Sequence, residues 1–368
     1  MQFIDLQAQY RAYRDEMDAA MGAVVESARF INGPQVRELE EKLAAYVGVG
    51  HAVGMSSGTD ALLAVLMAWG IGPGDEVICP AFTFIATAEV VALAGAKPIF
   101  VDVEPRTLNL DPELLDAAIT PRTRAVIPVS LYGQCADFPA INAVAERHGL
   151  PVLEDACQSF GAMQGGRRSC GLTTAAATSF FPAKPLGCYG DGGMCFTNDG
   201  ALAERLRVIR EHGQTARYRH AVVGLNARLD TLQAAVLLVK IAHFDDEVAA
   251  RQRVARRYIE GLSGAVEMPP IREGDQSIYA QFTVRVSDRE RVIQRLTEKG
   301  VPTAVHYPLP LHRQPVFTGL EGGAASDEVL PVASRAAREV LSLPMHPFLT
   351  EAEQDEVIAA LKEAVREG

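Results

Sequence analysis

Short runs of β-forming residues alternate with stretches of helical periodicity over roughly the first 240 residues, and no other feature of the chain restricts its fold as strongly. The expected strands are 76–79, 98–101, 125–129, 152–154, 177–181 and 194–197. Such alternation is typical of an α/β layered structure. Val36, Leu39, Leu43 and Val47 form one apolar stripe of an expected helix, which we interpret as ordinary core packing.

The pattern changes near residue 245. We expect a long charged helix there, then an alternating strand over 277–286, and then helices over 288–299 and 350–366. A chain of 368 residues also exceeds what one hydrophobic core usually serves. We therefore predict a large α/β/α domain over 1–244 and a smaller C-terminal α+β domain over 245–368. The stretch 319–326 is expected to form a flexible loop.

One lysine stands in an unusual setting. Lys184 follows the apolar run 178–183, and the Gly-rich segment 190–193 comes soon after it. An amine with apolar neighbours is partly desolvated, which lowers its pKa and exposes a nucleophilic lone pair. Pyridoxal phosphate needs such an amine to form a Schiff base with its aldehyde. The alternative is a solvated surface lysine near a turn.

Asp155 ends the apolar run 150–155, which we expect to be a short buried strand. Its carboxylate would then lie at the C-terminal edge of a sheet, where α/β proteins bind their ligands. A carboxylate there can keep the pyridine nitrogen of pyridoxal phosphate protonated, so that the ring withdraws electrons. The alternative is that Asp155 caps a following helix. Taken with Lys184, it favours the cofactor role.

A third element, Ser57-Gly58-Thr59, precedes a helix-forming run over 62–69. Gly58 lets the backbone approach an anion, the first N–H groups of a helix point at it, and the Thr59 hydroxyl adds a donor. These residues therefore indicate a phosphate site. A small-residue N-cap without a ligand explains the same letters.

Charge and composition exclude several function classes. A net charge of −11 disfavours general nucleic-acid binding. No apolar run approaches the ~20 residues of a membrane span, and no export signal is visible, so we expect a cytoplasmic protein that does not enter membranes. The six cysteines contain no Cys-x-x-Cys pair, so we expect reduced thiols and no metal site.

A basic stretch over 205–220 departs from the acidic average of the chain. We interpret its arginines before His212 as a solvated helix face. Beyond Gly213 the residues are typical of a loop, which could receive an anionic nucleotide sugar.

In their order, these segments resemble the fold-type I, aspartate aminotransferase-like enzymes that use pyridoxal phosphate, and more narrowly the DegT/DnrJ family of nucleotide-sugar aminotransferases. The likeness is carried by 3–6, 31–34, 80–87, 154–159, 179–187, 226–230 and 305–308. Pro185 and the runs 130–137 and 342–347 are similar to bacterial enzymes that aminate C3 of a UDP-linked 2-acetamido-hexos-3-uluronic acid. Ala183 and Pro185 depart from many relatives, which have serine and asparagine there.

The resemblance implies a set of cofactor contacts. Phe84 lies where the family places an aromatic ring over one face of the pyridine, and Cys157 lies against the other face. Gln158 matches a residue whose amide contacts the ring hydroxyl, and Ser179 joins Gly58 and Thr59 around the phosphate. Each of these could instead be a core or turn residue, Phe84 above all.

The resemblance also implies a homodimer with shared active sites, because Asn226 matches a residue that the partner subunit contributes to the phosphate. Arg228, His306 and Tyr307 are the candidate substrate contacts. An arginine can bind the carboxylate of glutamate or of a uronic acid through two parallel hydrogen bonds. The alternatives are that Tyr307 belongs to a turn and that Arg228 pairs with Asp230.

The implied reaction transfers the amino group of L-glutamate to C3 of a UDP-2-acetamido-2-deoxy-hexos-3-uluronic acid, for bacterial surface polysaccharide (O-antigen) synthesis. Lys184 would carry the proton in both half-reactions while Asp155 stabilises the pyridinium. One alternative is an aminotransferase for C4 of a 4-keto-6-deoxy nucleotide sugar. A sugar dehydratase is disfavoured, because such relatives replace the lysine with histidine. A non-catalytic regulatory protein that binds pyridoxal phosphate is the third.

Overall fold

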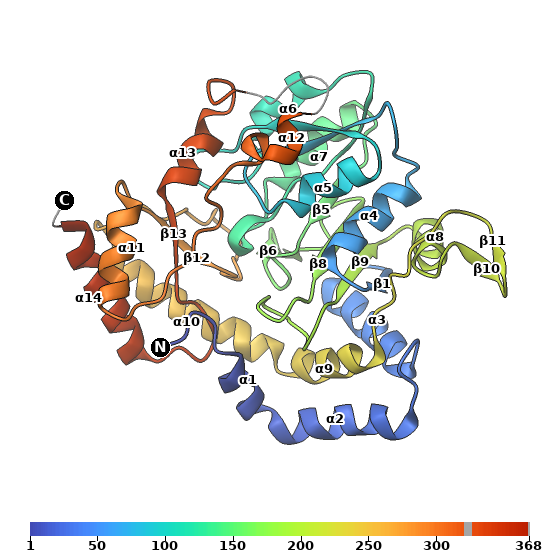
Figure 1. Cartoon of the computed structure of the whole chain (residues 1–368), viewed down its shortest axis with the longest axis horizontal. Helices are drawn as coiled ribbons and strands as arrows, with labels where there is room; N and C mark the ends of the chain where they lie inside the picture. The colour runs from blue at the N-terminus through green and yellow to red at the C-terminus, as the bar shows by residue number, and fades with distance from the viewer. Residues whose placement is uncertain (320–325, 367–368) are drawn as a thin grey trace.

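The computed structural model describes residues 1–319 and 326–366 (Figure 1). The expected loop over 319–326 therefore lies almost wholly outside the described residues. A mixed α/β layer structure forms the larger part of the chain, as the alternating pattern predicts. None of the helices in the described ranges is both long and apolar enough to cross a membrane.

The centre of the molecule is a seven-stranded sheet. Its strands in chain order are β1 (His51–Met55), β2 (Glu76–Pro80), β3 (Lys97–Val101), β4 (Thr123–Val126), β5 (Leu153–Asp155), β8 (Ala175–Ser179) and β9 (Gly193–Thr197). Hydrogen bonding gives the orders β3-β2-β4 and β5-β8-β9-β1. Two parallel bridges, Val126 with Val152 and Val129 with Asp155, join β4 to β5 and so unite the two groups.

All strands of this sheet run parallel except β9, which is antiparallel to both its neighbours. The six expected strands are confirmed within a few residues at their ends. β1 is the strand that the pattern did not predict. Its run is short and contains Gly54, where an added Cβ would lie 3.3 Å from the Leu229 side chain, so close packing explains the glycine.

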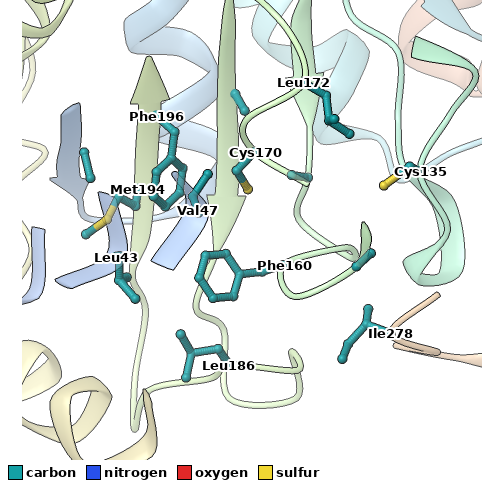
Figure 2. Close-up of a cluster of buried hydrophobic side chains, with 14 of the residues drawn as sticks. Leu43, Val47, Cys135, Phe160, Cys170, Leu172, Leu186, Met194, Phe196 and Ile278 are labelled. Carbon is teal, nitrogen blue, oxygen red and sulfur yellow. The ribbon is translucent and has the colours of Figure 1, made fainter. Parts of the chain in front are cut away.

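Helices cover both faces of the sheet, because alternate residues of each strand belong to different apolar clusters. In β9, Met194 and Phe196 pack on one side and Cys195 on the other. One face is covered by α3 (Pro34–Val47), α7 (Phe138–Arg147) and α9 (Thr231–Ala242), and the other by α4 (Gly58–Ala68), α5 (Ala86–Leu93) and α8 (Gly200–Arg210). Figure 2 shows the first cluster around Phe160 and Phe196.

Three further helices complete this part: α1 (Leu6–Ala12), α2 (Arg14–Ser27) and α6 (Pro112–Ala118). The stripe predicted at Val36, Leu39, Leu43 and Val47 is buried along α3, as expected for core packing. The short pair β6 (Met163–Gln164) and β7 (Arg167–Arg168) lies after β5.

The C-terminal part is a two-stranded antiparallel sheet with helices. Its elements are α10 (Phe244–Leu262), β12 (Phe282–Arg285), α11 (Arg289–Glu298), α12 (Pro315–Thr318), α13 (Pro331–Glu339), β13 (Val340–Leu343) and α14 (Glu351–Arg366). Tyr258, Phe282 and Leu341 belong to an apolar cluster of this part. The domain boundary at 244/245 stays a prediction.

Two predicted segments differ from the structure. The strand expected over 277–286 is confined to Phe282–Arg285, because Ile278 N donates to Gly133 O (2.9 Å) and ties the preceding residues to the other part of the chain. The loop expected after Gly213 is a hairpin of β10 (Gln214–Ala216) and β11 (Arg219–His220). Figure 1 shows this hairpin projecting from the body, at the right.

Candidate active site

Three segments that each follow the carboxyl end of a parallel strand meet at one edge of the sheet. Ser57 comes after β1, Asp155 ends β5 and Ser179 ends β8. Parallel strands place their carboxyl ends on the same edge, where ligands of α/β sheets bind. The topology therefore explains why residues so far apart in the chain become neighbours.

These segments line a cavity of about 460 Å³. Ten of the twelve predicted site residues line it: Gly58, Thr59, Phe84, Asp155, Cys157, Gln158, Ser179, Lys184, His306 and Tyr307. Phe3, Ile4, Ser57, Thr83, Ala86, Phe181, Ala183, Asp191 and Gln281 complete the lining. The cavity thus contains one amine, a buried carboxylate and a helix N-terminus, the three groups that the sequence indicated.

Asp155 is held by hydrogen bonds rather than by a cation. Its Oδ2 accepts from the Thr87 hydroxyl (2.7 Å), and its Oδ1 accepts from Cys157 N (3.2 Å). Only 4% of the residue is exposed. The Cys157 contact closes a turn, not a helix, so the alternative that Asp155 is a helix cap is wrong. A carboxylate fixed in this way can face a cationic ring nitrogen in the cavity.

The N-terminus of α4 forms a close-fitting cradle. Ser57 Oγ accepts from Asp60 N (3.0 Å), so the predicted N-cap is present. A Cβ added to Gly58 would lie 2.7 Å from Ser179 Cβ and 2.8 Å from Cys157 Sγ. Gly58 is therefore required for close packing, and the free N–H groups of the first turn remain available to an anion.

Lys184 lies in a turn of the loop between β8 and β9, half-buried against the cavity. Its backbone N–H donates to Phe181 O (2.8 Å). An added Cβ at Gly187 would lie 2.4 Å from Pro182 O, so the loop folds back tightly on itself. The alternative of a solvated surface lysine therefore does not hold, because Lys184 is half-buried and lines the cavity.

Two aromatic residues, Phe84 and Tyr307, and the polar Gln158 and His306 also line the cavity. Gln158 Oε1 accepts from Tyr132 N (2.9 Å), and its Nε2 donates to Tyr307 Oη (3.1 Å). Phe84, 52% exposed, has its ring centroid 6.0 Å from that of Tyr307. Tyr307 is thus fixed by side-chain contacts and is more than a turn residue.

His306 is a neutral group in this site. Its Nδ1 lies 2.9 Å from Ser342 Oγ, and its backbone oxygen accepts from the Tyr132 hydroxyl. Burial, followed by the charge of Lys184, lowers the pKa of His306 to about 4. An imidazole of this kind can exchange hydrogen bonds with a polar substrate near neutral pH without adding positive charge.

Cys157 lines the cavity beside Gly58. Burial and the Asp155 carboxylate raise the pKa of its thiol well above the ordinary value. It is therefore a neutral, polarizable group suited to packing against a flat ring. All six cysteines are free thiols, and the described ranges contain no grouping of three His, Cys, Asp or Glu side chains that could hold a metal ion.

Asn226 and Arg228 do not line this cavity. Their segment runs beside the end of β1, where Ser56 N donates to Ala227 O (2.9 Å). Arg228 Nη1 pairs with Glu211 Oε2 (3.3 Å), not with Asp230 as the alternative held, and Asn226 is exposed. One protomer therefore places these two predicted contacts outside its own cavity.

Three polar residues illustrate what sequence reasoning did not assign to the site. Thr87 holds Asp155, while Asp191 and Gln281 line the cavity. Thr87 lies in the run 80–87 that carried the resemblance, so that run was the available signal. Gln281 had no such signal, because a strand pattern does not say which of its polar residues face a cavity.

Comparison with known proteins agrees with the family resemblance seen in the sequence. The profile of the DegT/DnrJ/EryC1/StrS aminotransferase family matches residues 12–362. The chain is 56% identical to the UDP-2-acetamido-2-deoxy-3-oxo-D-glucuronate aminotransferase of Pseudomonas aeruginosa, covering 98% of this chain and 99% of the relative. It is 47% identical to a pleiotropic regulatory protein of Geobacillus stearothermophilus, over 99% of this chain and 98% of the relative.

Solved structures are similar over the same length. A DegT DnrJ EryC1 StrS aminotransferase from Brucella abortus superposes with a TM-score of 0.95 at 45% identity, covering 99% of both chains. NtdA from Bacillus subtilis, with bound cofactor PMP, superposes with a TM-score of 0.89 at 31% identity, covering 99% of this chain and 83% of the other. The fold-type I architecture expected from the sequence is confirmed.

Proposed function

The chain belongs to the DegT/DnrJ/EryC1/StrS aminotransferase family, and we propose that it uses pyridoxal 5′-phosphate to transfer the amino group of L-glutamate to C3 of a UDP-2-acetamido-2-deoxy-hexos-3-uluronic acid. The product is a UDP-2-acetamido-3-amino-2,3-dideoxy-uronic acid, a precursor for O-antigen. One observation carries this proposal: the chain matches the UDP-2-acetamido-2-deoxy-3-oxo-D-glucuronate aminotransferase of Pseudomonas aeruginosa nearly end to end, at 56% identity. The cavity contains an amine, a carboxylate and a helix N-terminus, the groups that would hold the cofactor.

The residues fit the cofactor. The Gly58 cradle, the first turn of α4, and the hydroxyls of Thr59 and Ser179 surround one end of the cavity and would hold the phosphate. Asp155 would pair with the ring nitrogen. When bound, the cofactor supplies an aldehyde and an electron-withdrawing ring.

Other groups would hold the ring itself. Phe84 and Cys157 would cover its two faces, and the Gln158 amide would contact its hydroxyl. The Tyr307 hydroxyl keeps that amide oriented, because it accepts from Gln158 Nε2.

Lys184 carries the proton transfers. Its ε-amine would hold the cofactor covalently, and once free of that bond it would move the proton from Cα of L-glutamate to C4′ of the cofactor. In the second half-reaction the same amine would move a proton from C4′ to C3 of the sugar. Lys184→Ala is expected to abolish turnover, measured as 2-oxoglutarate release, while the variant still binds the pyridoxamine form of the cofactor.

Substrate recognition requires a second subunit in this proposal. The described residues that line the cavity include no arginine, although both glutamate and the uronic acid carry a carboxylate. Arg228 of a partner subunit would bind that carboxylate, with His306 and Tyr307 contributing from the first, and the partner's Asn226 would reach the phosphate. The expected cytoplasmic location stays a prediction.

The acceptor is tested by product analysis. We expect a mass shift from the 3-keto to the 3-amino sugar when purified enzyme, L-glutamate and the UDP-3-keto uronate are combined, with Lys184→Ala as the inactive control. Amination of a 4-keto-6-deoxy sugar in preference to the uronate would establish the C4 alternative. Bound cofactor whose visible absorbance does not change on addition of glutamate would instead favour a regulatory role.

A further inference from the structure

The loop between β8 and β9 carries Lys184, and its backbone is closed at both ends. Phe180 N donates to Gly192 O (2.8 Å), and Cys188 N donates to Phe180 O (2.7 Å). Between these points the chain makes the tight turn at Gly187 described above. The direction in which Lys184 points therefore depends on how the segment 181–189 is held.

Helix α9 holds this segment at two positions on one of its faces. The Lys240 ammonium donates to Gly187 O at 2.6 Å and lies 4.6 Å from the centroid of the Tyr189 ring. Gln233 Oε1 accepts from Tyr189 N at 2.8 Å. The two side chains are two helical turns apart, so they lie on the same side of the helix.

A third contact comes from the loop itself. Leu186, two residues after Lys184, is only 1% exposed and belongs to the main apolar cluster. Figure 2 shows Leu186 below the ring of Phe160, which belongs to the same cluster. Leu186 fixes how deep the loop lies, and Lys240 fixes the adjoining carbonyl.

The Lys240 ammonium makes its hydrogen bond to Gly187 O at a large cost in desolvation free energy. The residue is 2% exposed, and burying an ammonium group costs far more than burying a methylene chain of the same length. Burial lowers the pKa of Lys240 to about 8, although Glu247 and Cys188 oppose the shift. The amine is still mainly protonated at neutral pH, when it is the stronger donor to Gly187 O.

We propose that Lys240 is a positioning residue: by holding the Gly187 carbonyl, its ammonium fixes the turn that presents the Lys184 ε-amine to the cavity. The inference rests on the proposed role of Lys184 as the covalent anchor of the cofactor. Lys240 itself does not line the cavity.

The test separates the covalent bond to Lys184 from the rest of cofactor binding. Pyridoxal phosphate bonds to Lys184, whereas pyridoxamine phosphate occupies the same cavity without that bond. Apoprotein carrying Lys240→Met is mixed with each compound, and the rate of Schiff-base formation and both affinities are measured by absorbance and fluorescence. We expect Schiff-base formation to slow on the order of tenfold or more, while pyridoxamine phosphate binds within about twofold of wild type.

If the role of Lys240 were purely structural, Lys240→Met would weaken the binding of both compounds in equal proportion. That result would overturn the proposal. So would an unchanged rate of Schiff-base formation. Lys42→Met, which removes an exposed lysine of α3, is the matched control and should behave as wild type. If Lys240→Met does not fold, Gln233→Leu removes the second attachment from the same helix face, and the same selective loss is expected in smaller degree.

An experiment on the wild-type protein distinguishes the proposed function from the positioning role of Lys240. If borohydride reduction of the wild type does not attach the cofactor to Lys184, the proposed function fails whatever the variants do. If it does, and Lys240→Met reacts normally, only the positioning role fails.

Discussion

At the scale of single residues, the Thr87 hydroxyl is the donor that fixes the Asp155 carboxylate, at 2.7 Å. Thr87→Val removes this hydrogen bond in a fully buried place, and a bond to a charged group contributes about 1.5–3 kcal/mol. We expect kcat to fall on the order of tenfold, because Asp155 then holds the ring proton less well. Steady-state kinetics measure the effect, and Thr87→Ser, which keeps the hydroxyl, should retain most of the activity. If Thr87→Val had the same kcat as Thr87→Ser, the Thr87 hydroxyl would not be needed to support Asp155.

His306 predicts a pH dependence of stability. Its pKa of about 4 in the folded state lies below the ordinary 6.5, so the unfolded chain binds the proton more tightly. The stabilisation from neutral His306 is therefore complete above about pH 6.5 and is lost as the pH falls toward 4, by on the order of 3 kcal/mol in total. His306→Gln should lose less unfolding free energy than wild type between about pH 7 and pH 4.5 in urea titrations of the cofactor-free protein. The exposed His220, replaced by Gln, is the control, and a slope unchanged in His306→Gln would contradict the assignment.

The residues of the site differ in how far the sequence alone could find them. Lys184 and Asp155 are predictable because a lysine in an apolar run and an acid at a strand end are unusual locally. Thr87 and Lys240 lie within ordinary helical runs, and their partners Asp155 and Gly187 are distant in the chain. A local pattern contains no information about such contacts, so only the packed structure shows them.

At the scale of elements, the N-terminus of α4 tolerates no side chain at its first residue. Gly58→Ala would place a Cβ 2.7 Å from Ser179 Cβ, so the cradle must move. We expect a loss of about 1–3 kcal/mol in unfolding free energy, together with weaker binding of the cofactor. Gly22→Ala in α2 is the matched control, because nothing lies within 4 Å of the added Cβ; it should stabilise the protein by about 0.5–1 kcal/mol. Denaturant unfolding and cofactor titration of both variants decide, and wild-type cofactor affinity in Gly58→Ala would contradict the cradle.

Element prediction failed where tertiary contacts replaced the local pattern. The run 277–286 alternates like a strand, but Ile278 N bonds to Gly133 O, so only its end pairs with β13. The segment after Gly213 has the composition of a loop, and still it closes as a hairpin. In α3 the stripe and the burial agree, because that helix packs by its own periodicity alone.

At the scale of the whole molecule, the projecting hairpin and the distant Arg228 predict a site shared between two subunits. Tyr218 and Val223 are 80% and 85% exposed, which is costly for a surface that stays in water. Inactive Lys184→Ala and inactive Arg228→Ala chains are therefore unfolded, mixed and refolded together. Half of the random dimers are mixed and each of these contains one intact site, so we expect about a quarter of wild-type activity. No recovery in the mixture would mean that Arg228 acts within its own chain.

The overall architecture was accessible from the sequence through its alternation and its resemblance to a family, whereas the proposed sharing of the site between two subunits follows from neither the cavity nor the pattern alone. Asn226 and Arg228 illustrate the reason. Asn226 was expected at the phosphate of a partner subunit and Arg228 at the substrate, and one chain leaves both outside its own cavity. A property that belongs to two copies of a chain cannot be read from the periodicity of one.

The narrow join between β4 and β5 has a mechanical consequence. Two blocks of strands, β3-β2-β4 and β5-β8-β9-β1, are joined along one seam by backbone hydrogen bonds. Examples are Asp155 N to Pro128 O (2.9 Å) and Ser130 N to Asp155 O (3.1 Å). Asp155 lies on that seam. Phe84 follows β2 in one block of strands, and Lys184 follows β8 in the other. A coenzyme bound by all three residues would hold the two blocks together. In the cofactor-free protein we therefore expect local opening to begin along this seam and to displace the Asp155 carboxylate first.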